Sequence, residues 1–243
     1  MKKIKGFSGL IKLFFRLVMS MIYHYQYLND DLENNFMVCK KICKMIVRSA
    51  HIDLLVHNQE SIPRDKTFLM VPNHRCFFDV VFLLASIEQP ISFVAAKELW
   101  SYPVLRRYLT AIECIPLDRY TKNLAKLKSN ITQIQTSLSK NNLVMFPEGK
   151  CSYESEEMGE FKKGGFMGVV GMDIYLVPAF IKIGEFKNIG KKWMIPSGQV
   201  EIYIGDSFLP KDVSDKRIQA QEMASYAKKR VQLLQEQARR KKE

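Results

Sequence analysis

Residues 68–79 read FLMVPNHRCFFD and set the pattern on which the rest of the chain is built. The apolar run 68–71 is typical of a buried strand, Pro72 ends it, and a helix is expected to begin near Phe78. After Pro63, short apolar runs alternate with longer stretches of helical periodicity. This alternation predicts an α/β fold, with a central mixed and mostly buried sheet flanked by helices.

The expected elements of this fold fall between residues 59 and 243. We expect strands at residues 67–72, 91–95, 112–117, 143–146, 174–181 and 199–204. We expect helices at residues 78–88, 102–109, 122–140, 164–172 and about 214–240. The sequence shows no internal repeat and no linker rich in Gly, Pro and Ser, so residues 59–243 are expected to form one domain.

Residues 1–58 differ from the rest of the chain in combining apolar and basic side chains. Residues 5–28 and 36–48 place bulky apolar side chains beside lysines and arginines, and the polar turn 29–31 separates the two stretches. This composition predicts an amphipathic two-helix hairpin that associates with a membrane and lies in its headgroup region. The alternative is that both are ordinary helices facing the core of a basic protein. No run of about 18 uncharged apolar residues is present, so we do not expect the chain to cross a bilayer.

The net charge narrows the choice of partners. The formal charge is +12, which favours an anionic membrane surface or a nucleic acid. The basic residues are spread through apolar helices and the tail, without the signature of an RNA-binding sheet or a helix-turn-helix, so we expect no nucleic acid. Five cysteines without framework spacing indicate free thiols and a reducing compartment.

The turn after the first expected strand holds a histidine and a carboxylate that could act together. His74 and Asp79 would lie about 140° apart on a regular helix, so they can meet only across a turn that runs into a helix. Asp79 would then fix the imidazole tautomer and raise its basicity. With no serine or cysteine nucleophile expected beside it, such a pair would deprotonate a hydroxyl of the substrate, giving direct transfer without a covalent intermediate.

Two simpler interpretations of this turn stay open. Cys76 is a candidate for an overlooked nucleophile, although it is only two residues from His74. Alternatively, Asn73, His74 and Asp79 only cap the helix and close the turn.

Three further segments carry polar residues at strand ends. Residues 143–152 read LVMFPEGKCS, in which proline stops a strand and glycine allows close approach of the backbone to a ligand. Residues 115–119 read IPLDR and end in a cation suited to a phosphate oxygen. Residues 175–181 read YLVPAFI, an apolar strand broken by a proline.

The chain thus contains four motifs in this order: Asn-His-x-x-x-x-Asp, Ile-Pro-Leu-Asp-Arg, Phe-Pro-Glu-Gly and Val-Pro. Together they resemble the four blocks of the glycerolipid acyltransferase family, and most closely its bacterial 1-acyl-glycerol-3-phosphate acyltransferases. The resemblance runs from about Phe68 to Ile181. It implies transfer of a fatty acyl group from acyl-carrier protein (acyl-ACP) or acyl-coenzyme A (acyl-CoA) to the free sn-2 hydroxyl of 1-acyl-glycerol-3-phosphate, which forms phosphatidic acid.

The resemblance also implies roles for individual residues. His74 would be the general base and Asp79 would orient it, while Arg119 would bind the acceptor phosphate. Lys97 matches a lysine common in the family and is a second candidate for that phosphate, or else a solvated lysine at a helix start. Glu148 and Gly149 would position the glycerol part of the acceptor, and Pro178 would shape the acyl-donor region. The residues expected to bind substrate are Asn73, Lys97, Arg119, Glu148, Gly149, Lys150 and Pro178.

The third block departs from the family pattern. The family continues Phe-Pro-Glu-Gly with Thr-Arg-Ser, whereas Lys150 and Cys151 stand here in place of Thr and Arg. Lys150 would supply the missing charge as a point charge, without the fork of an arginine. Another lysophospholipid headgroup, or glycerol-3-phosphate, therefore remains an alternative acceptor. Lys162 and Gly164, in a Phe-Lys-x-Gly segment that commonly follows this block, are expected at the mouth of the site.

The reaction so implied needs neither a metal nor a prosthetic group. The expected partners are an anionic phospholipid membrane, a lysophospholipid acceptor, and a thioester of acyl-carrier protein or coenzyme A. The expected location is the cytoplasmic face of the cell membrane, as a peripheral or monotopic protein.

Overall fold

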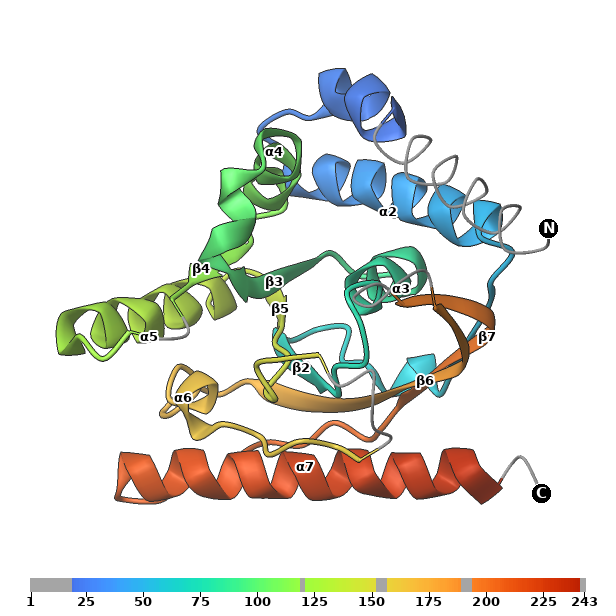
Figure 1. Cartoon of the computed structure of the whole chain (residues 1–243). Helices are drawn as coiled ribbons and strands as arrows, with labels where there is room; N and C mark the ends of the chain where they lie inside the picture. Colours follow the sequence, from blue (N-terminus) through green and yellow to red (C-terminus); the bar gives the residue numbers. More distant parts are fainter. Residues whose placement is uncertain (1–18, 119–120, 152–156, 189–193, 241–243) are drawn as a thin grey trace.

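A central sheet of seven strands organises the part of the chain that the computed structural model describes, which is residues 19–118, 121–151, 157–188 and 194–240 (Figure 1). The strand order is β1-β7-β6-β2-β5-β3-β4. Strands β2 to β6 run parallel, β7 is antiparallel to β6, and β1 is parallel to β7. The mixed sheet predicted from the sequence is therefore confirmed. The strands are β1 Asp53–His57, β2 Phe68–Pro72, β3 Ile91–Ala96, β4 Ile115–Leu117, β5 Asn142–Val144, β6 Tyr175–Asn188 and β7 Met194–Ile204.

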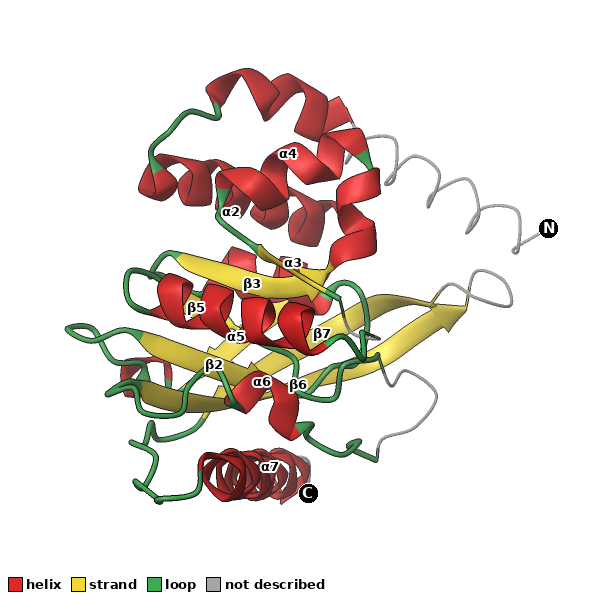
Figure 2. Ribbon diagram, turned by 90° about the vertical axis from the view of Figure 1, so that its left-hand side faces the viewer, coloured by secondary structure: helices red, strands yellow, loops and turns green. Residues whose placement is uncertain are grey.

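Helices cover the two faces of this sheet in separate layers (Figures 1 and 2). One layer contains α2 (Leu32–Ser49), α3 (Asp79–Ser86) and α4 (Pro103–Ala111). Helices α5 (Leu124–Leu138), α6 (Lys163–Phe166) and α7 (Lys216–Arg240) contribute to a second core. Short 3-10 turns, η1 (Tyr25–Tyr27), η2 (Gln59–Ser61) and η3 (Lys97–Ser101), lie between the longer elements.

Strand β2 lies at the centre of the sheet, and both of its faces are covered. Phe68 and Met70 point into the core beneath α2, α3 and α4, while Leu69 and Val71 join the core on the α7 side. This alternation follows from the two-residue period of a strand. All five residues of β2 are buried, and β5 and β6 pair with its two edges. The turn after Pro72 therefore starts from one of the most enclosed points of the molecule.

Several boundaries differ from those predicted. Strand β4 begins at Ile115 rather than at residue 112, because the chain turns at Glu113, where φ is +53°. Helix α6 ends at Phe166, well before the predicted residue 172. Strands β6 and β7 extend beyond the predicted ranges and pair as a long antiparallel hairpin. Strand β1 was not predicted at all.

The N-terminal segment is divided between the core and the surface. Helix α2 buries Phe36, Ile42 and Ile46, so the core-facing alternative describes this helix. Its Lys40 is also buried and donates a hydrogen bond to Ile87 O at the end of α3. Because β1 pairs with β7, the predicted domain boundary at residue 58 does not coincide with the start of the sheet.

The first described residues keep an exposed apolar surface. Residues 19–24 are helical, and η1 follows them. The exposed large apolar side chains of this segment are Met19, Ile22, Tyr23, Tyr25 and Tyr27. Residues 1–18, most of the first predicted hairpin helix, lie outside the described residues. Within the described parts of the chain, no helix is long and apolar enough to cross a membrane.

Candidate active site

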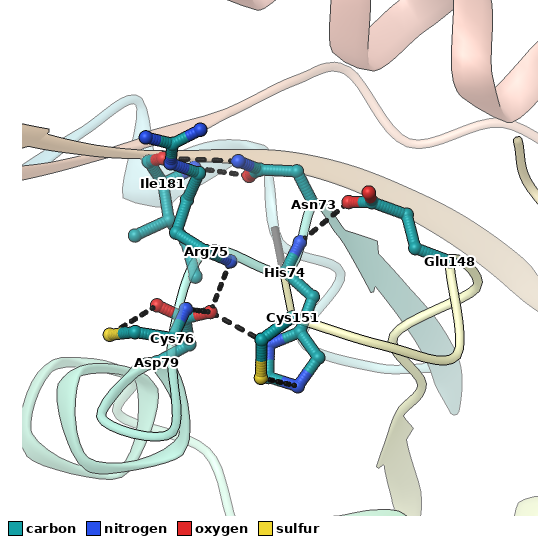
Figure 3. Close-up of polar contacts among 8 residues, drawn as sticks. All are labelled: Asn73, His74, Arg75, Cys76, Asp79, Glu148, Cys151 and Ile181. Carbon is teal, nitrogen blue, oxygen red and sulfur yellow. Dashed lines mark hydrogen bonds and ion pairs between the residues drawn. The ribbon is translucent and has the colours of Figure 1, made fainter. Parts of the chain in front are cut away.

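The turn between β2 and α3 brings His74 and Asp79 into contact (Figure 3). His74 Nδ1 lies 2.8 Å from Asp79 Oδ2, so the predicted contact is confirmed. The two residues meet because His74 lies in the turn while Asp79 is the first residue of α3. The carboxylate accepts a hydrogen bond from Nδ1–H, which leaves Nε2 as the nitrogen able to take up a proton.

Asp79 also accepts hydrogen bonds from backbone groups of the turn. Its Oδ2 also accepts hydrogen bonds from the backbone N–H groups of Arg75 at 2.6 Å and Cys76 at 2.9 Å. The carboxylate is fully buried, and three donors together with the amino-terminal end of α3 stabilise its negative charge. Asp79 therefore closes the turn and orients His74 at the same time, which combines the functional and the capping interpretations.

Two side chains fasten this turn to the neighbouring strands. Asn73 exchanges two hydrogen bonds with the backbone of Ile181 on β6, donating to Ile181 O at 3.1 Å and accepting from Ile181 N at 2.7 Å. Glu148, which follows β5, accepts from His74 N at 2.7 Å and from Gly159 N at 2.8 Å. Both side chains are buried and bound to backbone groups. Direct contact of Asn73 or Glu148 with substrate stays a prediction.

A cysteine lies against the other nitrogen of the imidazole. Cys151 Sγ is 3.2 Å from His74 Nε2 (Figure 3). The ring of Phe146 stacks on the imidazole with 4.1 Å between ring centroids. The expectation that no thiol stands beside His74 is therefore wrong. The signal available in the sequence was that Cys151 falls in the third block, two residues after Gly149.

Cys76, the cysteine considered from the sequence, points elsewhere. Its Sγ contacts Asp79 Oδ1 at 3.5 Å instead of the imidazole of His74. Burial and the nearby charge of Asp79 raise the pKa of the Cys76 thiol, which suppresses its nucleophilic thiolate. Cys76 therefore packs under the turn.

The cationic residues predicted to bind substrate lie in different places. Gly149 has φ of +70°, and a Cβ atom built on it would come 3.1 Å from Lys162 Nζ. The backbone N–H of Lys162 donates a hydrogen bond to Pro147 O, which fixes the backbone of Lys162 beside the third block. Lys150 is exposed, and Lys97 donates to Asp118 Oδ2 at 2.6 Å. Arg119 lies outside the described residues.

Pro178 lies on β6, in register with Val71 of β2. Its ring is buried, and a Cβ atom built on Gly205 would come 3.0 Å from its Cγ. A role of Pro178 in shaping the acyl-donor region stays a prediction.

The surroundings of His74 increase the affinity of its imidazole for a proton. Burial lowers the pKa of His74, but the hydrogen bond and charge of Asp79, together with the contact with Cys151, outweigh burial and raise the pKa to about 9. The site thus combines a strong base, an orienting carboxylate and a thiol. In the described part of the chain, no group of three His, Cys, Asp or Glu residues is arranged to hold a metal ion.

Comparison with known proteins gives one consistent result. Residues 53–182 match the family model described as Acyltransferase. A probable 1-acyl-sn-glycerol-3-phosphate acyltransferase of Mycoplasma pneumoniae is 26% identical over 182 residues, which are 71% of this chain and 65% of that protein. A 1-acyl-sn-glycerol-3-phosphate acyltransferase of Bacillus subtilis is 26% identical over 171 residues, 69% of this chain and 79% of that protein.

A solved structure has the same fold. The crystal structure of the 1-acyl-sn-glycerophosphate (LPA) acyltransferase PlsC from Thermotoga maritima superposes with a TM-score of 0.70 at 20% sequence identity. The match covers 93% of this chain and 97% of that one.

The imidazole of His74 should titrate near pH 9 in the folded protein. Since this pKa lies above the ordinary value of about 6.5, the stability that proton binding contributes is fully present below about pH 6.5 and is lost as the pH rises through about 9. Histidine-selective labelling and a pH titration by NMR measure the midpoint. Asp79→Asn should move it down toward the ordinary range, and a wild-type midpoint at or below the ordinary value would contradict this electrostatic description.

Proposed function

The chain belongs to the acyltransferase family, and on that premise we propose that it transfers a fatty acyl group from acyl-ACP or acyl-CoA to the sn-2 hydroxyl of 1-acyl-glycerol-3-phosphate, forming phosphatidic acid. The contact between His74 and Asp79 carries this proposal. The match spans only 65% of the length of the Mycoplasma relative, so the reaction itself is our inference.

His74 acts as the general base of the proposed reaction. Its Nε2 takes the proton of the acceptor hydroxyl as the oxygen attacks the acyl carbonyl carbon, and Asp79 stabilises the imidazolium that forms. Glu148 holds the backbone N–H of His74 and Asn73 fastens the preceding residue to β6, so we assign them positioning roles. The stacked ring of Phe146 restricts rotation of the imidazole.

The acceptor phosphate is recognised by the cations near the third block. Lys162 Nζ lies over Gly149, two residues before Cys151, which stands in place of the family's arginine. We propose that Lys162 binds the acceptor phosphate in place of the arginine that the family has at position 151. Arg119 and Lys150 are further candidates for this contact. The relatives named for the same acceptor favour a phosphate monoester over another headgroup.

The protein meets its lipid substrates at the membrane surface. The exposed side chains of residues 19–27 and the formal charge of +12 favour an anionic bilayer. We propose a peripheral location on the cytoplasmic face of the cell membrane, where acyl thioesters are available. Phe77, in the turn between His74 and Asp79, also exposes its apolar ring.

His74→Ala should lower the rate of phosphatidic acid formation by a factor of about 10² to 10⁴, because general base catalysis contributes on this scale. The assay follows a radiolabelled palmitoyl thioester, of acyl-carrier protein or of coenzyme A, into lipid product identified by mass. His51→Asn is a matched control, because His51 is exposed and asparagine tolerates its φ of +53°. Activity of His74→Ala within tenfold of wild type would remove His74 as the base.

Lys162→Met should raise KM for 1-acyl-glycerol-3-phosphate by roughly tenfold or more with little change in kcat, since a charge-assisted hydrogen bond contributes about 1.5–3 kcal/mol. Steady-state kinetics with varied acceptor measure the effect. Lys163→Met is the matched control, because Lys163 is the exposed neighbour at the start of α6. Equal KM values for the two variants would exclude the assigned role of Lys162.

The double substitution Ile22→Glu and Tyr23→Glu should weaken binding to anionic vesicles at least fivefold. Both side chains are exposed, and two carboxylates would oppose their insertion among anionic headgroups. Sedimentation with vesicles of phosphatidylglycerol and phosphatidylcholine measures this change. Leu233→Glu, on the exposed face of α7, is the control that should bind like wild type. Unchanged binding of the double variant would refute the membrane contact.

A further inference from the structure

The imidazole of His74 has a different partner at each of its nitrogens. Asp79 Oδ2 lies 2.8 Å from Nδ1, and Cys151 Sγ lies 3.2 Å from Nε2 (Figure 3). A carboxylate, an imidazole and a thiol connected in this order form the arrangement by which a protein activates its own nucleophile. The thiol also occupies the nitrogen that the acceptor hydroxyl would need for direct transfer.

Cys151 differs from the other cysteines in its accessibility. Cys39, Cys43, Cys76 and Cys114 are buried, whereas Cys151 is partly exposed in the loop after β5. Burial raises the pKa of each of the four buried thiols, so none of them is suited to attack a substrate. Cys151 is therefore the partly exposed thiol at this site.

We infer that Cys151 is a catalytic nucleophile that carries the acyl group from the donor to the acceptor. The inference rests on the proposed function and adds a covalent intermediate to it. It replaces the direct transfer expected from the sequence, because that expectation assumed that no nucleophile stands beside His74.

In the first step, His74 Nε2 takes the proton of the Cys151 thiol as the sulfur attacks the carbonyl carbon of the donor thioester. The bond between that carbon and the donor sulfur then breaks, and the leaving thiolate takes the proton from His74. The products are an acyl thioester on Cys151 and the free thiol of the donor. One thioester replaces another, so the step needs no co-reactant and retains the reactivity of the acyl group.

In the second step, the acceptor hydroxyl uses the nitrogen that Cys151 has vacated. An acylated sulfur has no proton to donate, so Nε2 is free to accept the hydroxyl proton. The hydroxyl oxygen bonds to the acyl carbon, the carbon–sulfur bond breaks, and the Cys151 thiolate regains its proton from His74. The ester product leaves with the enzyme restored, and both half-reactions use the same base.

The test is isotope exchange without acceptor. Wild-type protein is mixed with an unlabelled palmitoyl thioester and the corresponding radiolabelled free thiol, using whichever donor, acyl-CoA or acyl-ACP, supports phosphatidic acid formation. The inference predicts that label enters the thioester, and that Cys151→Ala and His74→Ala each reduce this exchange at least 100-fold. Cys39→Ala, which removes a buried thiol of α2, should exchange as wild type does.

A mass measurement identifies the intermediate directly. Acid quenching of wild type with the donor alone should give protein heavier by one palmitoyl group on the peptide containing Cys151, and neutral hydroxylamine should remove it. If wild type forms phosphatidic acid but shows neither exchange nor adduct, and Cys151→Ala keeps activity within twofold, the covalent step is overturned while the proposed function stands. If no donor gives product, the proposed function itself fails.

Discussion

The carboxylate of Asp79 is the group on which the geometry of the site depends. It lies fully buried at the start of α3 and accepts hydrogen bonds from the imidazole of His74 and from two backbone N–H groups of the preceding turn. A buried anion is costly without such donors, so these three hydrogen bonds are what stabilise the carboxylate inside the turn. Asn73 and Glu148 then tie the same turn to β6 and to the loop after β5.

The chemistry follows from the position of this turn in the sheet. Because β2, β5 and β6 are parallel neighbours, their carboxyl ends lie side by side, and the loops after β2 and β5 converge. The first loop supplies His74, while the second supplies Glu148, Cys151 and the stacked ring of Phe146. The sheet thus holds a base and a thiol within one small region.

Local patterns predicted much of this arrangement. The apolar run 68–71 gave the central strand, and the spacing of His74 and Asp79 gave the turn between strand and helix. Strand β1 escaped prediction because it is only partly buried, and its apolar run is three residues long between Asp53 and His57. The contact of Cys151 with His74 joins residues 77 positions apart, and no local periodicity reports such a contact. For the same reason, the sequence does not show that Lys40 hydrogen-bonds to the end of α3, and a lysine beside apolar residues predicts a membrane-facing helix instead.

The central claim is that a buried carboxylate makes His74 an effective base for acyl transfer. The most direct test is the rate of phosphatidic acid formation by Asp79→Asn, a substitution of the same shape, with circular dichroism and thermal unfolding recorded on the same preparation. We predict a folded protein whose rate is lower by a factor of about 10² to 10⁴, because an amide neither fixes the tautomer nor stabilises the imidazolium. A folded variant with a rate within threefold of wild type would contradict the account.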